Sequence, residues 1–344
     1  SSLLYRYDDM SMLDFLMRYN LPDPFMAFFC TLMNLFFVVP VDQVPVSEAI
    51  LTLKDVAKGG AGRYHKFGYG DIAEKAVKYV EKNNGQYISG TRVDKILVEN
   101  NKAVGVSTKD GDYRAPVIIS NAGIQPTVLK LSGKKHFNKT YTERVAALEP
   151  SLAFVGLRYY LKKPVIQYPM TVAFSDNSWF DKARFKAAEK GTWPDPPLVF
   201  ATVPSLYDPA LATNDIPQTA LIGTISSPDP ESPMNKTAIE KLEAGIEKLW
   251  PEINDHTIEK HAADAHAVSA MTRDSVVPGQ GGECIGLGQV IGQCGKTKPD
   301  PKTPLPGLYL VGADAGGHGI GTTQAVDSGF NVAELVYKAH SKNR

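Results

Sequence analysis

The segment from Gly307 to Gln324 constrains the fold of this chain more than any other part of the sequence. It predicts a buried strand at 308–311, a turn that carries Asp314 among five glycines, and a helix that begins near Thr322. A sixth glycine, Gly307, precedes the strand. A helix N-terminus presents N–H groups and a positive dipole end to an electron-rich ligand, and a carboxylate accepts hydrogen bonds from ligand hydroxyls. The alternative is a tight strand-to-helix connection without a ligand. We favour a ligand-binding loop because so many glycines surround one carboxylate.

The residues 308–329 resemble the closing FAD-binding motif of the phytoene desaturase-like flavoproteins, within the amine oxidase and glutathione reductase-type FAD superfamily. The resemblance implies that Asp314 holds the ribityl chain and that the helix N-terminus faces the pyrimidine end of the isoalloxazine. Reduced flavin is anionic near N1 and O2, so a helix N-terminus there would stabilise it by ~0.3–2 kcal/mol. The cofactor-binding residues implied in this segment are Gly312, Asp314, Ile320, Gly321, Thr322 and Thr323.

Members of that family open with a strand, a G-x-G-x-x-G turn and a helix that bind the FAD pyrophosphate. This sequence contains no such motif. Its early glycine cluster at 59–62 follows a polar segment, and the spacing Gly60-x-Gly62 is not continued by the third glycine of the motif. We therefore expect the chain to be the C-terminal portion of a larger protein, or a subunit. An N-terminal fragment or partner subunit would then carry the pyrophosphate site.

Residues 61–125 resemble the middle segment of the FAD-binding domain. Phe67-Gly68-Tyr69-Gly70-Asp71 leads into a predicted helix with Ile72, Ala73, Ala76 and Val80 on one face, followed by an antiparallel meander and an apolar strand at 115–122. By resemblance, the cofactor-binding positions in this block are Gly68, Val93, Asn121 and Ala122. The family turn carries two adjacent glycines, and the Gly68-Tyr69-Gly70 sequence departs from that pattern.

Residues 126–300 predict a separate domain inserted between FAD-binding segments. Runs at 152–161, 171–174, 198–203 and 219–225 read as strands, and a helix with an apolar stripe follows at 239–249. A glycine-rich run at 279–288 has no Lys-Ser or Lys-Thr after it, so a flexible loop is favoured over a nucleotide-binding loop. We expect a mixed sheet with one or two helices that covers the flavin.

Residues 1–60 are apolar and helical in pattern, and 25–39 is the most apolar stretch. It is shorter than the ~20 residues that span a bilayer. A buried core helix is the favoured interpretation. The functional alternatives are a wall of a lipophilic tunnel, lined for example by Phe29 and Phe36, and a face that makes a peripheral membrane contact.

The overall composition limits the partners of this chain. Its 344 residues are 43% hydrophobic with a formal net charge of zero, so charge indicates neither nucleic acid nor an anionic surface as a partner. Cys30, Cys284 and Cys294 are too few for a disulfide scaffold and are expected to be reduced, as in the cytoplasm, although Cys284 and Cys294 could pair. His256, His261 and His266 are expected on or near a helix, without the spacing of a metal site.

His318 lies inside the glycine loop, beside the flavin that the resemblance implies. Since an imidazole titrates near ~6.5, it is a candidate catalytic residue that exchanges a proton; a structural hydrogen bond is the favoured alternative. The fold class predicted is α/β: a discontinuous FAD-binding domain of glutathione reductase type, with an inserted substrate domain of mixed β-sheet plus helix. Its domains would be 1–60 (apolar helical part of the substrate domain), 61–125 (middle FAD segment), 126–300 (substrate domain) and 301–344 (closing FAD segment).

The function expected from the resemblance is FAD-dependent oxidation or reduction of a long apolar, isoprenoid or carotenoid-like substrate. Desaturation, isomerisation and saturation all stay open. The flavin supplies the hydride chemistry, and the protein orients the substrate and excludes water. The alternatives are a flavin amine oxidase, and a non-catalytic subunit of a split flavoprotein.

Overall fold

The computed structural model describes residues 4–59, 65–264, 286–317 and 319–341. Its first helices follow the apolar pattern of the sequence. Ser11 caps the first helix by accepting a hydrogen bond of 3.0 Å from the Asp14 backbone N–H. The second helix ends at Val38 in a left-handed conformation, two residues before Pro40. These helices are α1 (Met12–Met17), α2 (Asp23–Phe37) and α3 (Val46–Gly59). They enclose a shared N-terminal core whose buried members include Met12, Leu16, Met33 and Phe37.

Asn34 shows how α2 is fixed to the rest of the molecule. Its fully buried amide donates hydrogen bonds of 2.9 Å to the carbonyl oxygens of Val39 and Phe180, and accepts one of 2.7 Å from the Phe180 N–H. A buried amide left without partners would destabilise the fold, so these bonds select one position for α2.

The middle block forms a long helix and a meander, as predicted. The turn between its first two strands places both Asn100 and Asn101 at positive φ, the geometry that a tight hairpin requires. The strands pair antiparallel in the order β1-β2-β3. The elements are α4 (Gly68–Lys82), β1 (Val93–Glu99), β2 (Lys102–Thr108) and β3 (Gly111–Arg114).

The apolar face predicted for α4 is present, but no described element covers it. None of the α4 residues is buried, and Ile72 and Val80 are 43% and 44% exposed. The periodicity correctly predicted an amphipathic helix, but it carries no information on which element covers the apolar side.

The strands between residues 153 and 263 form one antiparallel sheet of five strands. Four strands were predicted, and a fifth, β9 (Thr257–Ala263), was missed. His261 lies in this strand, so the expectation that it lies on or near a helix is wrong, whereas His256 lies in the short 3-10 helix before the strand, as expected. Exposed polar residues in β9 masked its alternation. The order is β6-β7-β8-β5-β9, with β5 (Ala153–Leu161), β6 (Met170–Ala173), β7 (Val199–Thr202), β8 (Gln218–Ser226) and β9 (Thr257–Ala263).

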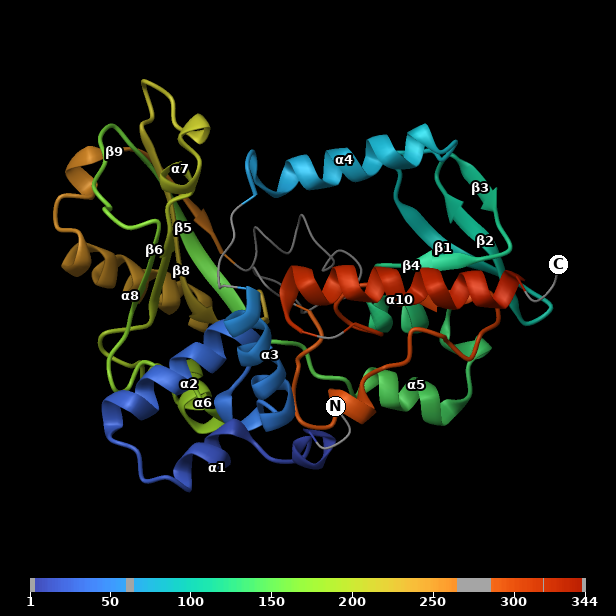
Figure 1. The fold of residues 1–344 in the computed structure, drawn as a ribbon, viewed down its shortest axis with the longest axis horizontal. Helices are drawn as coiled ribbons and strands as arrows, with labels where there is room; N and C mark the ends of the chain where they lie inside the picture. The colour runs from blue at the N-terminus through green and yellow to red at the C-terminus, as the bar shows by residue number, and fades with distance from the viewer. Residues whose placement is uncertain (1–3, 60–64, 265–285, 318, 342–344) are drawn as a thin grey trace.

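Helix α8 (Met234–Leu249) covers one face of this sheet, and α2 lies against the other (Figure 1). Leu242 and Ile246 of α8 pack on Leu157 and Ile222 in a fully buried cluster. Gly245 allows close packing, since a Cβ there would lie 3.1 Å from the Val199 side chain. Three shorter α-helices also lie in the described part of the chain: α5 (Lys139–Ala146), α6 (Lys182–Glu189) and α7 (Pro204–Tyr207).

The apolar strand at the end of the middle block does not extend the meander. It forms β4 (Ile118–Ser120), which pairs in parallel with β10 (Leu308–Leu310), followed by α10 (Gly321–Ser341). Figure 1 shows α10 running beside this pair, with the meander at the same end of the molecule. Two segments almost two hundred residues apart therefore meet at one sheet edge.

Candidate functional site

The parallel pairing of β4 with β10 brings together residues that the sequence assigned separately. Ile118 is aligned with Leu308, and the Val311 N–H donates a hydrogen bond of 2.9 Å to the Ser120 carbonyl oxygen. Both strands end at the same side, so Asn121 and Gly312 become neighbours. The carboxyl ends of parallel strands are where α/β folds bind ligands.

Gly312 is required by this contact. Its φ is 108°, and a Cβ there would collide with the Asn121 carboxamide oxygen. The Gly312 N–H donates to the Ser328 hydroxyl at 3.1 Å, and that hydroxyl donates to the Ala315 carbonyl oxygen at 2.6 Å. Ser328 lies on α10, so the helix holds both ends of the first half of the glycine loop. Ala122 lies half-buried next to Asn121.

Asp314 is buried, at 4% exposure, and its carboxylate joins three segments. One oxygen accepts a hydrogen bond of 3.0 Å from the Ile124 N–H, and the other accepts one of 3.2 Å from the Leu287 N–H. An ionised carboxylate can accept about four hydrogen bonds. These contacts give Asp314 a structural role that the sequence did not indicate, in addition to the ligand-binding role predicted for it.

The N-terminus of α10 presents its first residues to solvent. Gly321, Thr322 and Thr323 are exposed, while Ile320 packs against the N-terminal core. The first backbone N–H groups of a helix have no partner within the helix, so this end can bind an anionic or electron-rich group. The candidate catalytic residue His318 lies outside the described residues.

Lys298 is a half-buried side chain beside this loop that the sequence did not indicate. Its ammonium donates a hydrogen bond to the Gly317 carbonyl oxygen. Burial lowers its pKa, and the surrounding Cys294, Glu48, Asp314 and Asp327 act in the opposite direction. A lone lysine in a polar stretch carries no sequence signal, so only the fold reveals this contact.

Two side-chain amides supply further polar atoms near the start of α10: Gln324 in the helix and Gln289 in the segment before β10. Gln289 donates a hydrogen bond of 3.2 Å from Nε2 to Oε1 of Gln324, which is 1% exposed. The other two amide atoms, Gln289 Oε1 and Gln324 Nε2, are buried and have no partner among the described residues. A buried amide donor and acceptor without partners are suited to a polar ligand edge, because unmet hydrogen bonds are costly.

The structure does not bring Gly68 and Val93 to the glycine loop through any contact it describes. Gly68 donates its N–H to His65 at the start of α4, and Val93 pairs with Thr108 in the meander. The preceding residue, Phe67, has a φ of 69° and donates its N–H to Asp208 at 2.9 Å. Asp208 thereby joins α4 to the inserted sheet.

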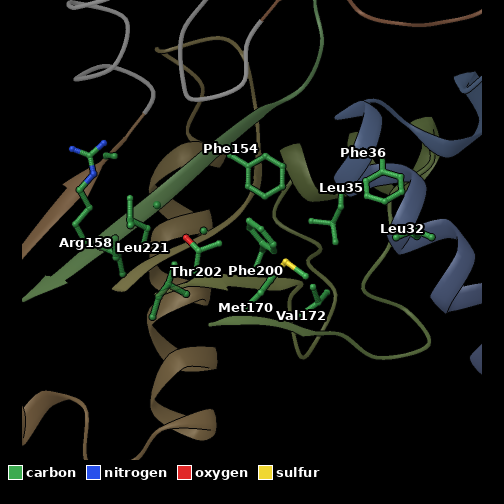
Figure 2. A pocket seen from close by; sticks show the side chains of 15 residues that line it. Leu32, Leu35, Phe36, Phe154, Arg158, Met170, Val172, Phe200, Thr202 and Leu221 are labelled. Atoms are coloured by element: carbon green, nitrogen blue, oxygen red, sulfur yellow. The ribbon is translucent and has the colours of Figure 1, made fainter. Parts of the chain in front are cut away.

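A pocket of about 520 Å³ lies on the face of the five-stranded sheet opposite α8. Gly156 of β5 and Gly223 of β8 are aligned, and together they form a patch of the pocket floor that has no side chains. Figure 2 shows Leu32, Leu35 and Phe36 of α2 at one end and Arg158 toward the other. Phe36 was predicted to line an apolar tunnel and lines this pocket. The remaining lining side chains are Phe154, Leu157, Met170, Val172, Phe200, Thr202, Leu221, Ile222 and Ala263.

Several sequence features have less to do with this site. Cys30 and Cys294 are buried free thiols, and burial raises the pKa of Cys30 to about 12; Cys284 and His266 lie outside the described residues. In the part of the chain that the structure describes, no group of three or more metal-ligating side chains comes together. Over the same residues, no helix is both long and apolar enough to cross a bilayer.

No protein-family model matches the chain. Among curated proteins, an inactive all-trans-retinol 13,14-reductase of Danio rerio is 26% identical over 162 residues, which cover 44% of this chain. The matched segment spans 27% of that protein's length, about a quarter of it.

Solved structures align over nearly the whole chain. An oxidoreductase from Methanosarcina mazei has a TM-score of 0.70 at 19% identity, covering 97% of this chain and 70% of that one. A Pyrococcus furiosus protein gives 0.64 at 16% identity, covering 97% and 71%. Cyclohexylamine oxidase from Brevibacterium oxydans gives 0.54 at 13% identity, covering 98% and 69%. The chain therefore has a fold that these three proteins share.

Proposed function

We propose that this chain is the substrate-binding and flavin-end part of an FAD-dependent oxidoreductase that acts on a long apolar, isoprenoid-like substrate. The observation that carries the proposal is the parallel alignment of β4 with β10. It places Asn121, Gly312 and Asp314, all assigned to FAD by resemblance, at one end of a sheet. The discontinuous FAD-binding domain would combine 61–125 with 301–344, and 126–300 with 1–60 would form the substrate domain.

When bound, the flavin would supply hydride transfer at N5. The residues of the loop fit such a group. Asp314 would accept a ribityl hydroxyl in addition to its two backbone bonds, and the N-terminus of α10 would face the pyrimidine ring. The amide atoms of Gln289 and Gln324 that have no partner among the described residues would pair with polar ring atoms. His318 is retained as a candidate proton-exchanging group beside the ring.

The apolar pocket is the proposed substrate site. Burying an apolar chain is favourable by about 0.8 kcal/mol per CH₂, so a site of this size binds mainly through hydrophobic contact and also excludes water. No described lining side chain is a carboxylate, and one is a guanidinium. That charge disfavours a cationic amine, which is the substrate class of the rival proposal, a flavin amine oxidase.

We further propose that the FAD pyrophosphate site comes from residues outside this chain's sequence, on an N-terminal segment or partner subunit. Among the described residues, β4 pairs with β10 alone, so the other edge of β4 has no partner strand. Parallel sheets are normally larger and covered on both faces. Ile119 of β4 is 48% exposed, and α4 exposes Tyr69 and Tyr79 as well as its apolar stripe. A further parallel strand and its helix would cover these groups.

Titration of FAD against the purified 344-residue chain, followed by quenching of flavin fluorescence, tests this assignment. We expect weak binding by the chain alone and tight, stoichiometric binding once the segment with the pyrophosphate motif is present. Submicromolar binding by the chain alone would contradict the split site. No binding in the complete assembly would favour the non-catalytic alternative.

A further inference from the structure

We propose that the substrate of the apolar pocket carries a carboxylate head, and that Arg158 binds it. The inference rests on the proposed function, since it takes the pocket as the substrate site. It adds a chemical class to that proposal: an amphipathic isoprenoid acid rather than a hydrocarbon or an amine.

The position of Arg158 follows from strand alternation. Along β5, the side chains of Phe154 and Arg158 point to the face opposite α8, and Gly156 lies between them on that face. Leu157 and Tyr159 point the other way and pack in the cluster beneath α8. Arg158 lies directly opposite Leu221 of β8. The guanidinium therefore stands at the end of the pocket floor, two residues from the side-chain-free patch formed by Gly156 and Gly223 (Figure 2).

The charge of the pocket is concentrated at this end. Of the described residues that line it, Arg158 carries the one formal charge, and Thr202 has the one hydroxyl. His261 of β9 is aligned with Arg158 on the other side, and its ring nitrogen lies 2.8 Å from a Glu259 carboxylate oxygen. Glu259 is thus paired with His261, and the guanidinium of Arg158 is the charged group that lines this end of the pocket.

The chemistry of the guanidinium selects the head group. Arginine is always protonated, and its planar fork binds a carboxylate through two parallel hydrogen bonds. It has five N–H donors, so a carboxylate that engages two of them does not require the whole group. An acid would place its head at Arg158 and its chain along the glycine floor toward Leu32 and Phe36 of α2.

The experiment compares ligands that share one chain and differ in the head: farnesoic acid, farnesol and farnesyl phosphate. Binding to the 344-residue chain is measured by isothermal titration calorimetry, which requires neither flavin nor turnover. We expect the acid to bind about tenfold more tightly than the alcohol, the ratio that ~1.4 kcal/mol represents. In Arg158→Gln that preference should disappear while binding of farnesol is unchanged.

Lys260→Gln is the matched control. Lys260 lies on the neighbouring strand beside Arg158, makes a 2.6 Å ion pair with Glu243, and is directed to the Tyr159 side of the sheet. The Lys260→Gln substitution removes one positive charge, as Arg158→Gln does, but outside the pocket. The variant should therefore still bind farnesoic acid more tightly than farnesol.

Three results would overturn the assignment: equal affinities for acid and alcohol, a preference for acid that persists in Arg158→Gln, or tighter binding of farnesyl phosphate than of the acid. In each of these cases the apolar pocket itself stays a substrate site. Failure of all three ligands to bind would instead contradict the pocket as the substrate site, and with it the proposed function.

Discussion

The Asp314 carboxylate accepts a hydrogen bond of 3.0 Å from the backbone N–H of Ile124, a residue 190 positions earlier in the chain. Ile124 follows β4, and Asp314 follows β10, so the bond closes the end of the parallel pair. The same carboxylate holds Leu287 at 3.2 Å. One buried charge thus fixes the relative position of the segments that are proposed to enclose the flavin.

Replacing Asp314 is expected to affect stability and flavin binding together. Asp314→Ala leaves the N–H groups of Ile124 and Leu287 buried without this acceptor, at a cost of about 1–3 kcal/mol each. Asp314→Asn keeps one acceptor oxygen and should be less destabilised, yet should still bind FAD more weakly in the complete assembly. Chemical denaturation and flavin titration measure the two effects. Unchanged FAD affinity in a folded Asp314→Asn protein would show that the carboxylate has only a structural role.

Gly312 is predicted to be intolerant of any side chain. Gly312→Ala places a Cβ at a φ of 108° and against Asn121, and we expect a loss of stability of at least about 1–3 kcal/mol. Gly329→Ala is the control: Gly329 lies within α10, and a methyl group added there would have nothing within 4 Å, so alanine should stabilise the helix by about 0.5–1 kcal/mol. Thermal unfolding of both variants checks the pair, and a Gly312→Ala protein as stable as the parent would refute the contact with Asn121.

The contact between Asp208 and α4 should weaken in acid. The Phe67 N–H, and after it the Ala210 N–H, hold the pKa of the Asp208 carboxyl below its usual value. The lowered pKa means that the ionised form favours the folded state. This contribution is complete above the unfolded value of ~3.9 and is lost as the pH falls through the lower folded value.

Asp208→Asn provides the comparison for that prediction. The unfolding temperatures of the parent and the variant should differ most near pH ~5 and converge as the pH approaches ~3 and below. A gap between the two proteins that stays constant across this range would show that ionisation of Asp208 does not support the fold.

Phe36 tests whether the pocket accepts long apolar chains. Affinity should rise with isoprenoid chain length until the volume of about 520 Å³ is filled. Phe36→Asp puts a charge in the wall and should weaken long ligands more than short ones. Phe25→Asp changes an exposed residue (59%) near the start of the same helix and should leave affinity unchanged. If Phe36→Asp lowered the affinity for ligands of all lengths equally, or if Phe25→Asp lowered it as much, the apolar part of the ligand would bind outside this pocket.

The sequence predicted the local elements well because their signals are local. The alternation of apolar residues gave β5, β7 and β8, and the run 308–324 gave β10, the glycine loop and the start of α10. The strand β9 was missed because six of its seven residues are not buried, which removes the period-two pattern.

The arrangement of the site depended on long-range contacts that sequence patterns do not encode. That Asn121 and Gly312 touch follows from the β4–β10 register, and the partners of Asp314 and Lys298 are backbone groups with no side-chain signature. The resemblance supplied residue roles but not the pocket, whose floor depends on two glycines that align only when β5 pairs with β8.

The central claim is that a flavin held by this fold exchanges hydride with an apolar isoprenoid. The most direct measurement is the oxidised-flavin absorbance of the FAD-loaded complete protein under anaerobic conditions. Phytoene, all-trans-retinol, all-trans-retinoic acid and cyclohexylamine are each added to the oxidised and to the dithionite-reduced protein. We predict that at least one isoprenoid bleaches or restores the band and that cyclohexylamine does neither. Bleaching by cyclohexylamine, with no spectral change from any isoprenoid, would contradict this account.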